Sequence, residues 1–162
     1  IGYLSSALGS HIMQIRHKAF FHALKQNGLK SDPTYAGSSY YITQCMEKHL
    51  PRLLDLGITS IVCSHDLIAN AAMIQCQQLG YKVPDEISII GFDDLPICAY
   101  TSPPLTTIRQ ERIQLGKSAY YALDSLMNQV SIGTLLLHAK LIERGSTREV
   151  PQTNNNIKRT GD

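Results

Sequence analysis

The stretch that most restricts the fold is an apolar, β-branched run at residues 87–92, which stops abruptly at two adjacent carboxylates, Asp93 and Asp94. Such a run is typical of a strand that is buried on both faces of a sheet. In a parallel α/β sheet, the carboxyl ends of the strands line the ligand crevice. Asp93 and Asp94 therefore stand where binding or chemistry is expected.

Segments with strand and helix patterns alternate along the chain. Strand patterns lie at residues 1–6, 34–37, 58–63 and 87–92. Apolar residues at helical spacing mark residues 11–27, 41–56 and 67–79. Pro51 makes a continuous helix over the second of these segments doubtful. Because helices long enough to cross over separate the strands, we predict an α/β fold with a parallel sheet and helices on both faces.

The last third of the chain is less regular. Helices are predicted at residues 96–100 and 111–130, and strand candidates lie at 105–108, 135–138 and 140–143. Residues 151–162 contain three consecutive asparagines and almost no apolar side chains, which predicts a mobile tail. The sequence therefore predicts one folded unit over residues 1–150.

Composition excludes several classes of protein. The 162 residues are 43% hydrophobic, enough for one core, and the 15 basic and 13 acidic residues are mixed, with no basic block for nucleic acid. The four cysteines form no C-x-x-C pair, which favours a reducing, cytoplasmic setting. We expect neither a membrane span nor an export signal. The chain starts without Met on a strand-like segment, so we expect it to be cut from a longer protein.

If the strands are parallel, polar side chains from three loops meet at one edge of the sheet. They include Arg16, His65, Asp66, Asp93 and Asp94. A guanidinium group donates hydrogen bonds in a plane and carboxylates accept them from hydroxyls, so this set suits sugars or polyols. Acid/base catalysis is the alternative, but adjacent Asp93 and Asp94 are expected to point in different directions. The pattern favours binding over catalysis.

Some of these residues also have structural interpretations. Asp66 follows a strand and opens a helix, so a capping role is favoured over a ligand contact. Asp94 is a candidate cap for the turn at residues 96–100, which leaves Asp93 as the carboxylate that faces the crevice. His65 fits a loop histidine as well as a ligand contact.

Two other kinds of site are weakly indicated or excluded. Cys45 and His49 form an i, i+4 pair that could hold zinc, but no second pair with metal spacing accompanies them. Residues 7–10 lack the fingerprint of either class of glycine-rich phosphate loop. We predict no metal and no cofactor.

Three motifs, in order along the chain, carry a resemblance to a known family. They are VPDEISIIGFDD at residues 83–94, SPPLTTIRQ at 102–110 and LIERGST at 141–147. With residues 61–67 and the neighbourhood of Arg16, they resemble the LacI/GalR family of bacterial transcription regulators. The resemblance runs from residue 1 to about residue 147 and covers the effector-binding region only.

The resemblance implies an architecture. Such regulators have an N-terminal helix-turn-helix and a two-lobed core like that of periplasmic sugar-binding proteins. Residues 1–150 would then form part of that core and resemble the C-terminal lobe of a type I periplasmic-binding-protein-like fold. The helix at 111–130 would cross into the other lobe. Without that lobe, four of its apolar residues would lack part of their cover, namely Ile113, Tyr120, Leu123 and Met127.

The resemblance also assigns effector-binding residues. Arg16 matches an effector-binding arginine, Asp93 matches an effector-binding aspartate, and Gln110 matches a polar residue at the lobe junction. His65 stands where sugar-responsive members often carry Asn, which would make binding sensitive to pH near neutrality. Ser39 replaces a stacking aromatic residue, so either Tyr40 supplies the ring or no stacking occurs. No residue is assigned to catalysis.

The function implied is that of a sensor. A small, sugar-like effector would alter operator binding by the full-length homodimer, and operator DNA would bind only through the missing N-terminal domain. The dimer surface would lie at residues 67–79 and 96–100, with Ala71, Ile74, Ile97 and Tyr100 as candidates. A periplasmic-type sugar-binding transport protein is the alternative, and an enzyme is not expected.

Overall fold

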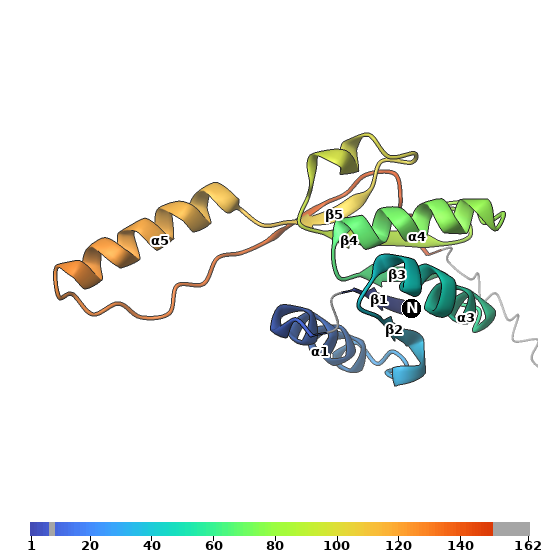
Figure 1. Ribbon diagram of the computed structural model, residues 1–162, viewed down its shortest axis with the longest axis horizontal. Coiled ribbons are helices and arrows are strands. Elements are labelled where there is room, and N and C mark those ends of the chain that lie inside the picture. The colour runs from blue at the N-terminus through green and yellow to red at the C-terminus, as the bar shows by residue number, and fades with distance from the viewer. Residues whose placement is uncertain (7–8, 151–162) are drawn as a thin grey trace, which may run out of the picture.

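The computed structural model describes residues 1–6 and 9–150. A six-stranded sheet, in the order β2-β1-β3-β4-β5-β6, is its centre (Figure 1). The strands are β1 (Gly2–Ser5), β2 (Ala36–Ser38), β3 (Ser60–Cys63), β4 (Ser88–Phe92), β5 (Thr106–Arg109) and β6 (Lys140–Ile142). The first five pair in parallel, and β6 is antiparallel to β5.

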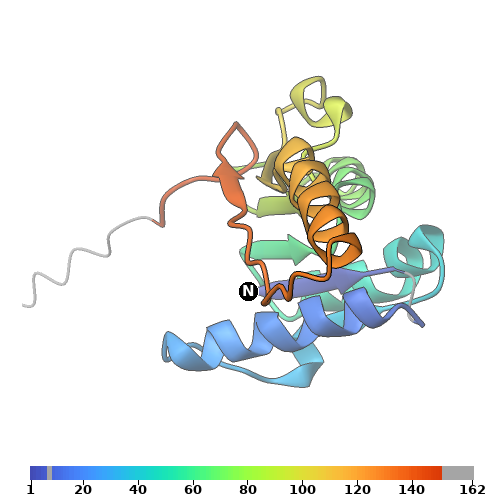
Figure 2. The same cartoon turned by 90° about the vertical axis from the view of Figure 1, so that its left-hand side faces the viewer.

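Helices cover both faces of the sheet, which confirms the predicted fold class. The α1 helix (His11–Gln26) packs on the face that carries Tyr3, where Phe20 and Leu24 complete a small buried cluster. On the opposite face, α3 (Leu50–Asp55) and α4 (Asp66–Gln78) enclose the main core (Figure 2). That core includes Leu4, Leu53, Ile61, Ile68 and Ile89. Alternating burial along the strands explains this division, since neighbouring side chains point to opposite faces.

The segment around Pro51 keeps a helical path, although its sequence made this doubtful. It runs through α2 (Ile42–Gln44), a π-helical stretch η2 (Cys45–His49) and α3. Proline has no N–H group to donate inside an α-helix, and the wider π turn lies directly before it. The predicted strand at 34–37 is shifted, because residues Pro33–Tyr35 form a 3-10 turn, η1, that Asp32 caps through the N–H group of Thr34.

The last third of the chain confirms some predictions and corrects one. A 3-10 helix, η3 (Pro96–Ala99), and the long helix α5 (Arg112–Met127) lie where they were predicted. The strand candidate at 135–138 is wrong, since these residues form no strand. Strand β5 ends at Arg109, which pairs with Lys140, so β5 has no residue left to pair with residues before 140. The predicted tail at 151–162 lies outside the described residues.

Helix α5 projects away from the sheet and buries none of its residues (Figure 1). The four apolar residues that were expected to lack cover are 58–78% exposed, and they are Ile113, Tyr120, Leu123 and Met127. A helix with a broad exposed apolar surface is typical of a segment that packs against a partner.

Candidate functional site

The carboxyl ends of β1, β3 and β4 bring the predicted residues together. Arg16 lies on the second turn of α1 and reaches across β1 to the end of β3, where it donates to the backbone oxygen of Ser64. Its guanidinium also donates to Asp93 Oδ1 over 3.3 Å, and the two side chains are 18% and 31% exposed. The guanidinium carbon lies 3.8 Å from the centre of the Phe92 ring. Arg16 is therefore held by a carbonyl, a carboxylate and a ring face.

Gln110 joins this pair from the end of β5. Its Nε2 donates to Asp93 Oδ1 over 2.8 Å, so Asp93 accepts hydrogen bonds from Arg16 and Gln110 on one oxygen. Within the described residues no protein group donates to its second oxygen, and the carboxylate is partly exposed. Arg16, Asp93 and Gln110, which were predicted from positions far apart in the chain, form one cluster.

His65 lies beside the cluster and caps helix α4. Its Nδ1 accepts from the N–H group of Ile68 over 3.4 Å, and its Nε2 is 2.6 Å from Ser6 Oγ. Because Nδ1 accepts, the ring proton is on Nε2, which donates to Ser6. Burial lowers the pKa of His65, with the charges of Asp93, Arg16 and Asp66 as smaller influences. Any pH dependence of binding that arises from His65 is thus expected at a lower pH than the near-neutral one predicted from the sequence.

Tyr40 stands apart from the other predicted residues. It lies two residues beyond β2, at the edge of the sheet, and is 65% exposed. Strands β1 and β3 separate β2 from β4, and three strand spacings of about 4.8 Å amount to about 14 Å. The structure does not bring Tyr40 into the cluster of Arg16, Asp93 and Gln110.

The structure corrects the roles of two other carboxylates. Asp66 is not the cap of α4, because His65 has that place. Instead Asp66, fully buried, accepts from Thr107 Oγ1 over 2.5 Å and from the N–H group of Leu95 over 2.7 Å. Asp66 is thus structural, as expected, but by tying α4 to β5 and to the start of η3.

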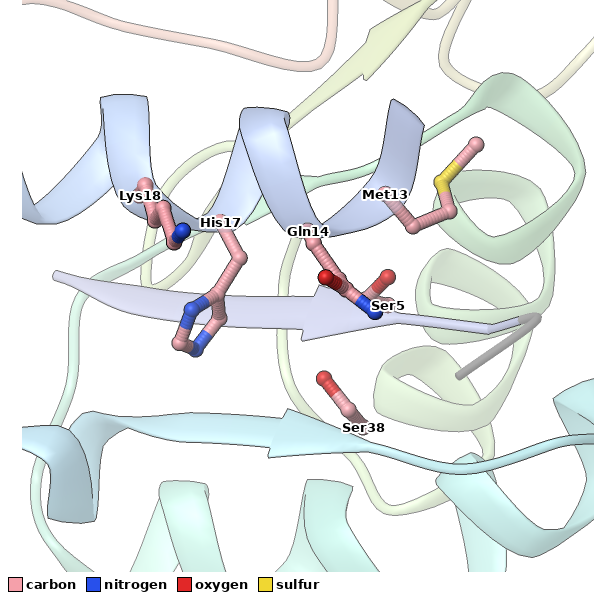
Figure 3. A pocket seen from close by; sticks show the side chains of 6 residues that line it. All are labelled: Ser5, Met13, Gln14, His17, Lys18 and Ser38. Carbon is pink, nitrogen blue, oxygen red and sulfur yellow. The ribbon is translucent and has the colours of Figure 1, made fainter. Parts of the chain in front are cut away.

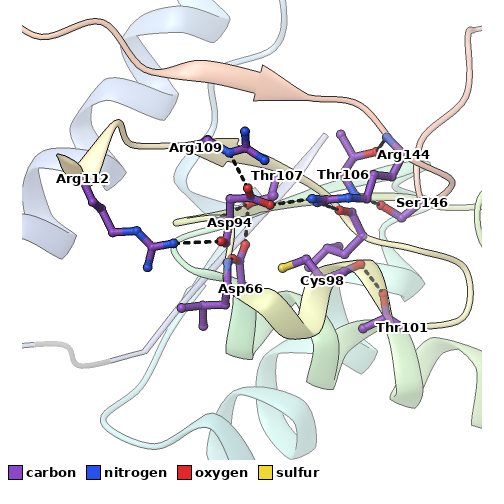
Figure 4. A network of polar contacts seen from close by, with 12 residues as sticks. Asp66, Asp94, Cys98, Thr101, Thr106, Thr107, Arg109, Arg112, Arg144 and Ser146 are labelled. Carbon is purple, nitrogen blue, oxygen red and sulfur yellow. Dashed lines mark hydrogen bonds and ion pairs between the residues drawn. The ribbon is translucent and has the colours of Figure 1, made fainter. Parts of the chain in front are cut away.

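Asp94 was predicted to cap the turn that follows it, and it does not. The N-cap residue of η3 is Leu95, and no side chain makes a capping hydrogen bond there. The Asp94 carboxylate instead accepts from Arg109 Nε over 2.5 Å and from Arg144 Nη2 over 2.7 Å (Figure 4). Burial alone would raise the pKa of this carboxyl, but the two arginines outweigh it and hold the pKa below its ordinary value. Each arginine is a cation and so attracts the carboxylate more strongly than a neutral backbone N–H group does.

Sequence reasoning missed several residues of this region. The ring of Phe92 stacks against Arg16, and Ser6 shares a hydrogen bond with His65. Arg109 and Arg144 form ion pairs with Asp94. Strand alternation places Phe92 on the face that α1 covers, so that signal was present in the sequence. The partners of Asp94 carried no such signal, since one of them is 50 residues away.

Cavities open at the carboxyl ends of the strands. One of about 280 Å³ opens between α1, β1 and β2 (Figure 3), and it is lined by Ser5, Met13, Gln14, His17, Lys18 and Ser38. Another, of about 230 Å³, is lined by Phe92, Gln110, Glu111, Leu115, Leu137, His138 and Ala139. Phe92 and Gln110 thus connect the cluster to open space beside the segment that leads into α5.

Cys45 and His49, the pair that was considered for zinc, each make a hydrogen bond elsewhere. Cys45 is a buried thiol whose Sγ donates to the backbone oxygen of Ser5 over 2.9 Å, and burial raises its pKa. His49 Nε2 is bonded to Ser39 Oγ. Within residues 1–6 and 9–150, no three His, Cys, Asp or Glu side chains gather as metal ligands would.

The cluster has the chemistry of a site for hydroxyl groups. A guanidinium supplies donors in a plane, a carboxylate supplies acceptors, and an amide supplies both. The charges of Arg16 and Asp93 compensate each other, so the site does not favour a strongly charged ligand.

Comparisons with known proteins identify the family of this chain. The periplasmic binding protein-like domain family matches residues 1–147. The transcriptional repressor CytR of Escherichia coli strain K12 is 35% identical over 155 residues, which cover 93% of this chain and 46% of CytR. This chain spans about half the length of that relative.

Solved structures show the same fold. The regulator CcpA of Lactococcus lactis has a TM-score of 0.77 and 29% identity, with 91% of this chain and 55% of CcpA covered. The Lac repressor dimer bound to operator and the anti-inducer ONPF has a TM-score of 0.78 and 26% identity, with 90% and 51% covered. None of the helices in the described part of the chain is long and apolar enough to cross a membrane. The chain belongs to the periplasmic binding protein-like domains, in the form found in LacI/GalR-type transcription regulators.

Proposed function

We propose that this chain is the effector-sensing part of a transcription regulator and binds a sugar or a related metabolite at Arg16, Asp93 and Gln110. The observation that carries the proposal is the junction of these three side chains at the carboxyl edge of the sheet. A vicinal pair of hydroxyls could accept from the guanidinium and donate to the free oxygen of Asp93. His65 and Tyr40 would contribute further contacts, Tyr40 to an extended ligand.

The same geometry argues against Ser6 and His65 as a catalytic pair. Ser6 and His65 are as close as a nucleophile and its base, at 2.6 Å. A base must accept the serine proton, whereas Nε2 of His65 carries a proton because Nδ1 accepts from Ile68. The pair therefore has the wrong tautomer to activate Ser6.

Signalling would proceed by a shift of population. The effector would favour one arrangement of a two-lobed domain, of which residues 1–150 form a part, and so change operator affinity in the intact protein. The exposed apolar surface of α5 would pack against the other lobe. Because the related proteins are named as repressors, a regulator is favoured over a transport protein. A regulator would act in the cytoplasm, where disulfides are rare, and the four cysteines are free thiols.

A homodimer would form through α4 and η3. Ile74, Ile97 and Tyr100 are 47%, 45% and 83% exposed and lie on these two elements or directly after them. Ala71, a fourth candidate, packs against the main core instead. In sedimentation velocity of the full-length protein, Ile74→Glu should shift the dimer toward monomer. Leu29 is 49% exposed and lies outside α4 and η3, so Leu29→Glu should leave the dimer intact. A monomeric wild type at micromolar concentration would contradict the dimer.

Effector binding is tested by thermal shift. The full-length protein is screened with pentoses, hexoses, sugar phosphates and nucleosides, and a true effector raises the unfolding temperature. Asp93→Ala should remove that shift and leave operator binding in a gel-shift assay intact. Asp85→Ala, which removes an exposed carboxylate before β4, is the matched control. A normal effector response in Asp93→Ala would overturn the assignment.

A further inference from the structure

The turn after β4 is held in an unusual backbone conformation. Asp93 has φ 112° and Asp94 has φ 49°, two consecutive non-glycine residues in the positive region. Such conformations cost free energy and persist only where the surroundings fix them. Since the turn contains the central carboxylate of the candidate site, what fixes it matters for binding.

The backbone of the turn is tied down at each residue. Each N–H group donates to a different acceptor: Asp93 to the Ile108 oxygen over 2.8 Å, Asp94 to Thr107 Oγ1 over 3.4 Å, and Leu95 to Asp66 Oδ2 over 2.7 Å. These acceptors belong to β5 and α4. The turn is thus fixed against both neighbours, and its two carboxylates have little freedom to exchange places.

The Asp94 side chain adds a charged anchor on the side away from the site. Only 8% of it is exposed, and Arg109 and Arg144 each engage one of its oxygens (Figure 4). Arg112 donates to the Asp94 backbone oxygen over 3.4 Å. The three arginines lie on β5, just after β6 and at the start of α5. Elements that follow the turn in sequence therefore hold it in place.

Asp93 and Asp94 point in opposite directions because they share this turn. Asp94 faces the two arginines, and Asp93 faces Arg16 and Gln110. A change in the anchor would rotate the peptide between them, and that rotation would move the Asp93 carboxylate.

We propose that Asp94 is a positioning residue for the effector site: with Arg109 and Arg144, it holds the turn in the conformation that aims Asp93 at Arg16 and Gln110. The proposal rests on the proposed function, in which Asp93 contacts the effector. Asp94 itself touches no ligand, since its carboxylate is buried among arginines.

Affinity and stability together separate positioning from a merely structural ion pair. Asp94→Asn keeps the shape of the side chain but removes its charge. Asparagine also tolerates a positive φ, so the backbone conformation remains accessible. Arg109→Gln is a milder variant, because Arg109 is 43% exposed and Arg144 remains. Asp85→Asn, which makes the same chemical change at an exposed carboxylate before β4, is the matched control.

The probes are D-glucose, D-galactose, D-ribose and adenosine, titrated by calorimetry into the full-length protein, and the compound that binds the wild type is used for all variants. Asp94→Asn should weaken binding on the order of tenfold, Arg109→Gln less, and Asp85→Asn not at all. In an Asp93→Asn background, Asp94→Asn should lower the unfolding temperature as before but change affinity little. The proposal is overturned if Asp94→Asn leaves the affinity unchanged. It is also overturned if Asp94→Asn lowers the affinity by the same factor in the Asp93→Asn protein as in the wild type.

A crystal structure of the ligand-free Asp94→Asn variant decides the question even if no probe binds the wild type. The expected result is that Asp93 leaves hydrogen-bond distance of Gln110 and that φ at residue 93 changes. If Asp93 keeps both partners, positioning by Asp94 is refuted. Failure of all probes with a displaced Asp93 would count against the choice of effector class and leave the positioning role supported.

Discussion

The guanidinium of Arg16 lies over the ring of Phe92, 3.8 Å from its centre, while it donates to Asp93, the next residue in the chain. One strand end thus supplies both a ring face and a carboxylate to the same cation. A cation above an aromatic ring is stabilised electrostatically, more so when it is partly desolvated. Phe92 consequently fixes the plane in which Arg16 presents its remaining donors.

Phe92→Leu should therefore weaken effector binding while the protein stays folded. The loss of a cation–π contact of about 0.5–2 kcal/mol predicts an affinity that falls by up to roughly thirtyfold. Calorimetric titration measures it in the full-length protein. Phe21→Leu is the control, since Phe21 packs against Phe20 and His17 and does not underlie Arg16. Equal affinities for the wild type and Phe92→Leu would show that the ring is only packing.

His65 predicts a pH dependence of stability. Burial lowers its pKa in the folded protein, so below about pH 6.5 the unfolded chain takes up the proton first. The contribution of His65 to stability is complete above that pH and is lost as the pH falls toward the lowered pKa. Protonation of Nδ1 would also break the cap on Ile68. His65→Asn keeps a capping acceptor without a titrating ring.

Urea unfolding at pH 8 and at pH 5.5 measures this effect. His17 and His49 also have lowered pKa values and contribute the same trend in both proteins. The wild type should lose more unfolding free energy on acidification than His65→Asn does. If the wild type instead loses less unfolding free energy than His65→Asn, the charges of Asp93 and Asp66, which favour the protonated ring, outweigh burial.

Gly91→Ala should destabilise the protein. A Cβ at this residue would lie 2.3 Å from Asp66 Oδ1 and 3.2 Å from a Leu105 methyl carbon, so the buried Asp66 would have to move. Overpacking of this kind costs about 1–3 kcal/mol in unfolding free energy. Gly116→Ala in exposed α5 is the control, because nothing lies within 4 Å of its Cβ position. That change should be neutral or gain up to about 1 kcal/mol.

Substitution of one leucine in the core and of one in α5 should have different effects on stability. Leu53 is fully buried and Leu123 is 58% exposed. In urea unfolding of the 162-residue chain, Leu53→Ala should cost about 2–5 kcal/mol and Leu123→Ala less than about 0.5 kcal/mol. In the full-length protein, Leu123→Ala should become clearly destabilising if α5 packs against another lobe. The same small effect in both proteins would contradict that packing.

The candidate site shows which spatial relationships the sequence predicts and which it does not. Arg16, Asp93 and Gln110 were found because motifs and strand ends mark them, and the structure brings them together. The roles given to Asp66 and Asp94 as caps were wrong. A cap is a local interaction that sequence spacing can suggest, whereas the actual donors, such as Arg144, come from distant segments.

By itself, the sequence determined the α/β class, most of the strands and helices, and the edge of the sheet where the candidate binding residues gather. These features follow from local periodicity and from the geometry of parallel sheets. Only the tertiary structure decided which way Asp93 and Asp94 point, which tautomer His65 adopts and that α5 buries nothing. Such features depend on contacts between residues far apart in the chain, and a local pattern does not encode which charged group will be within reach.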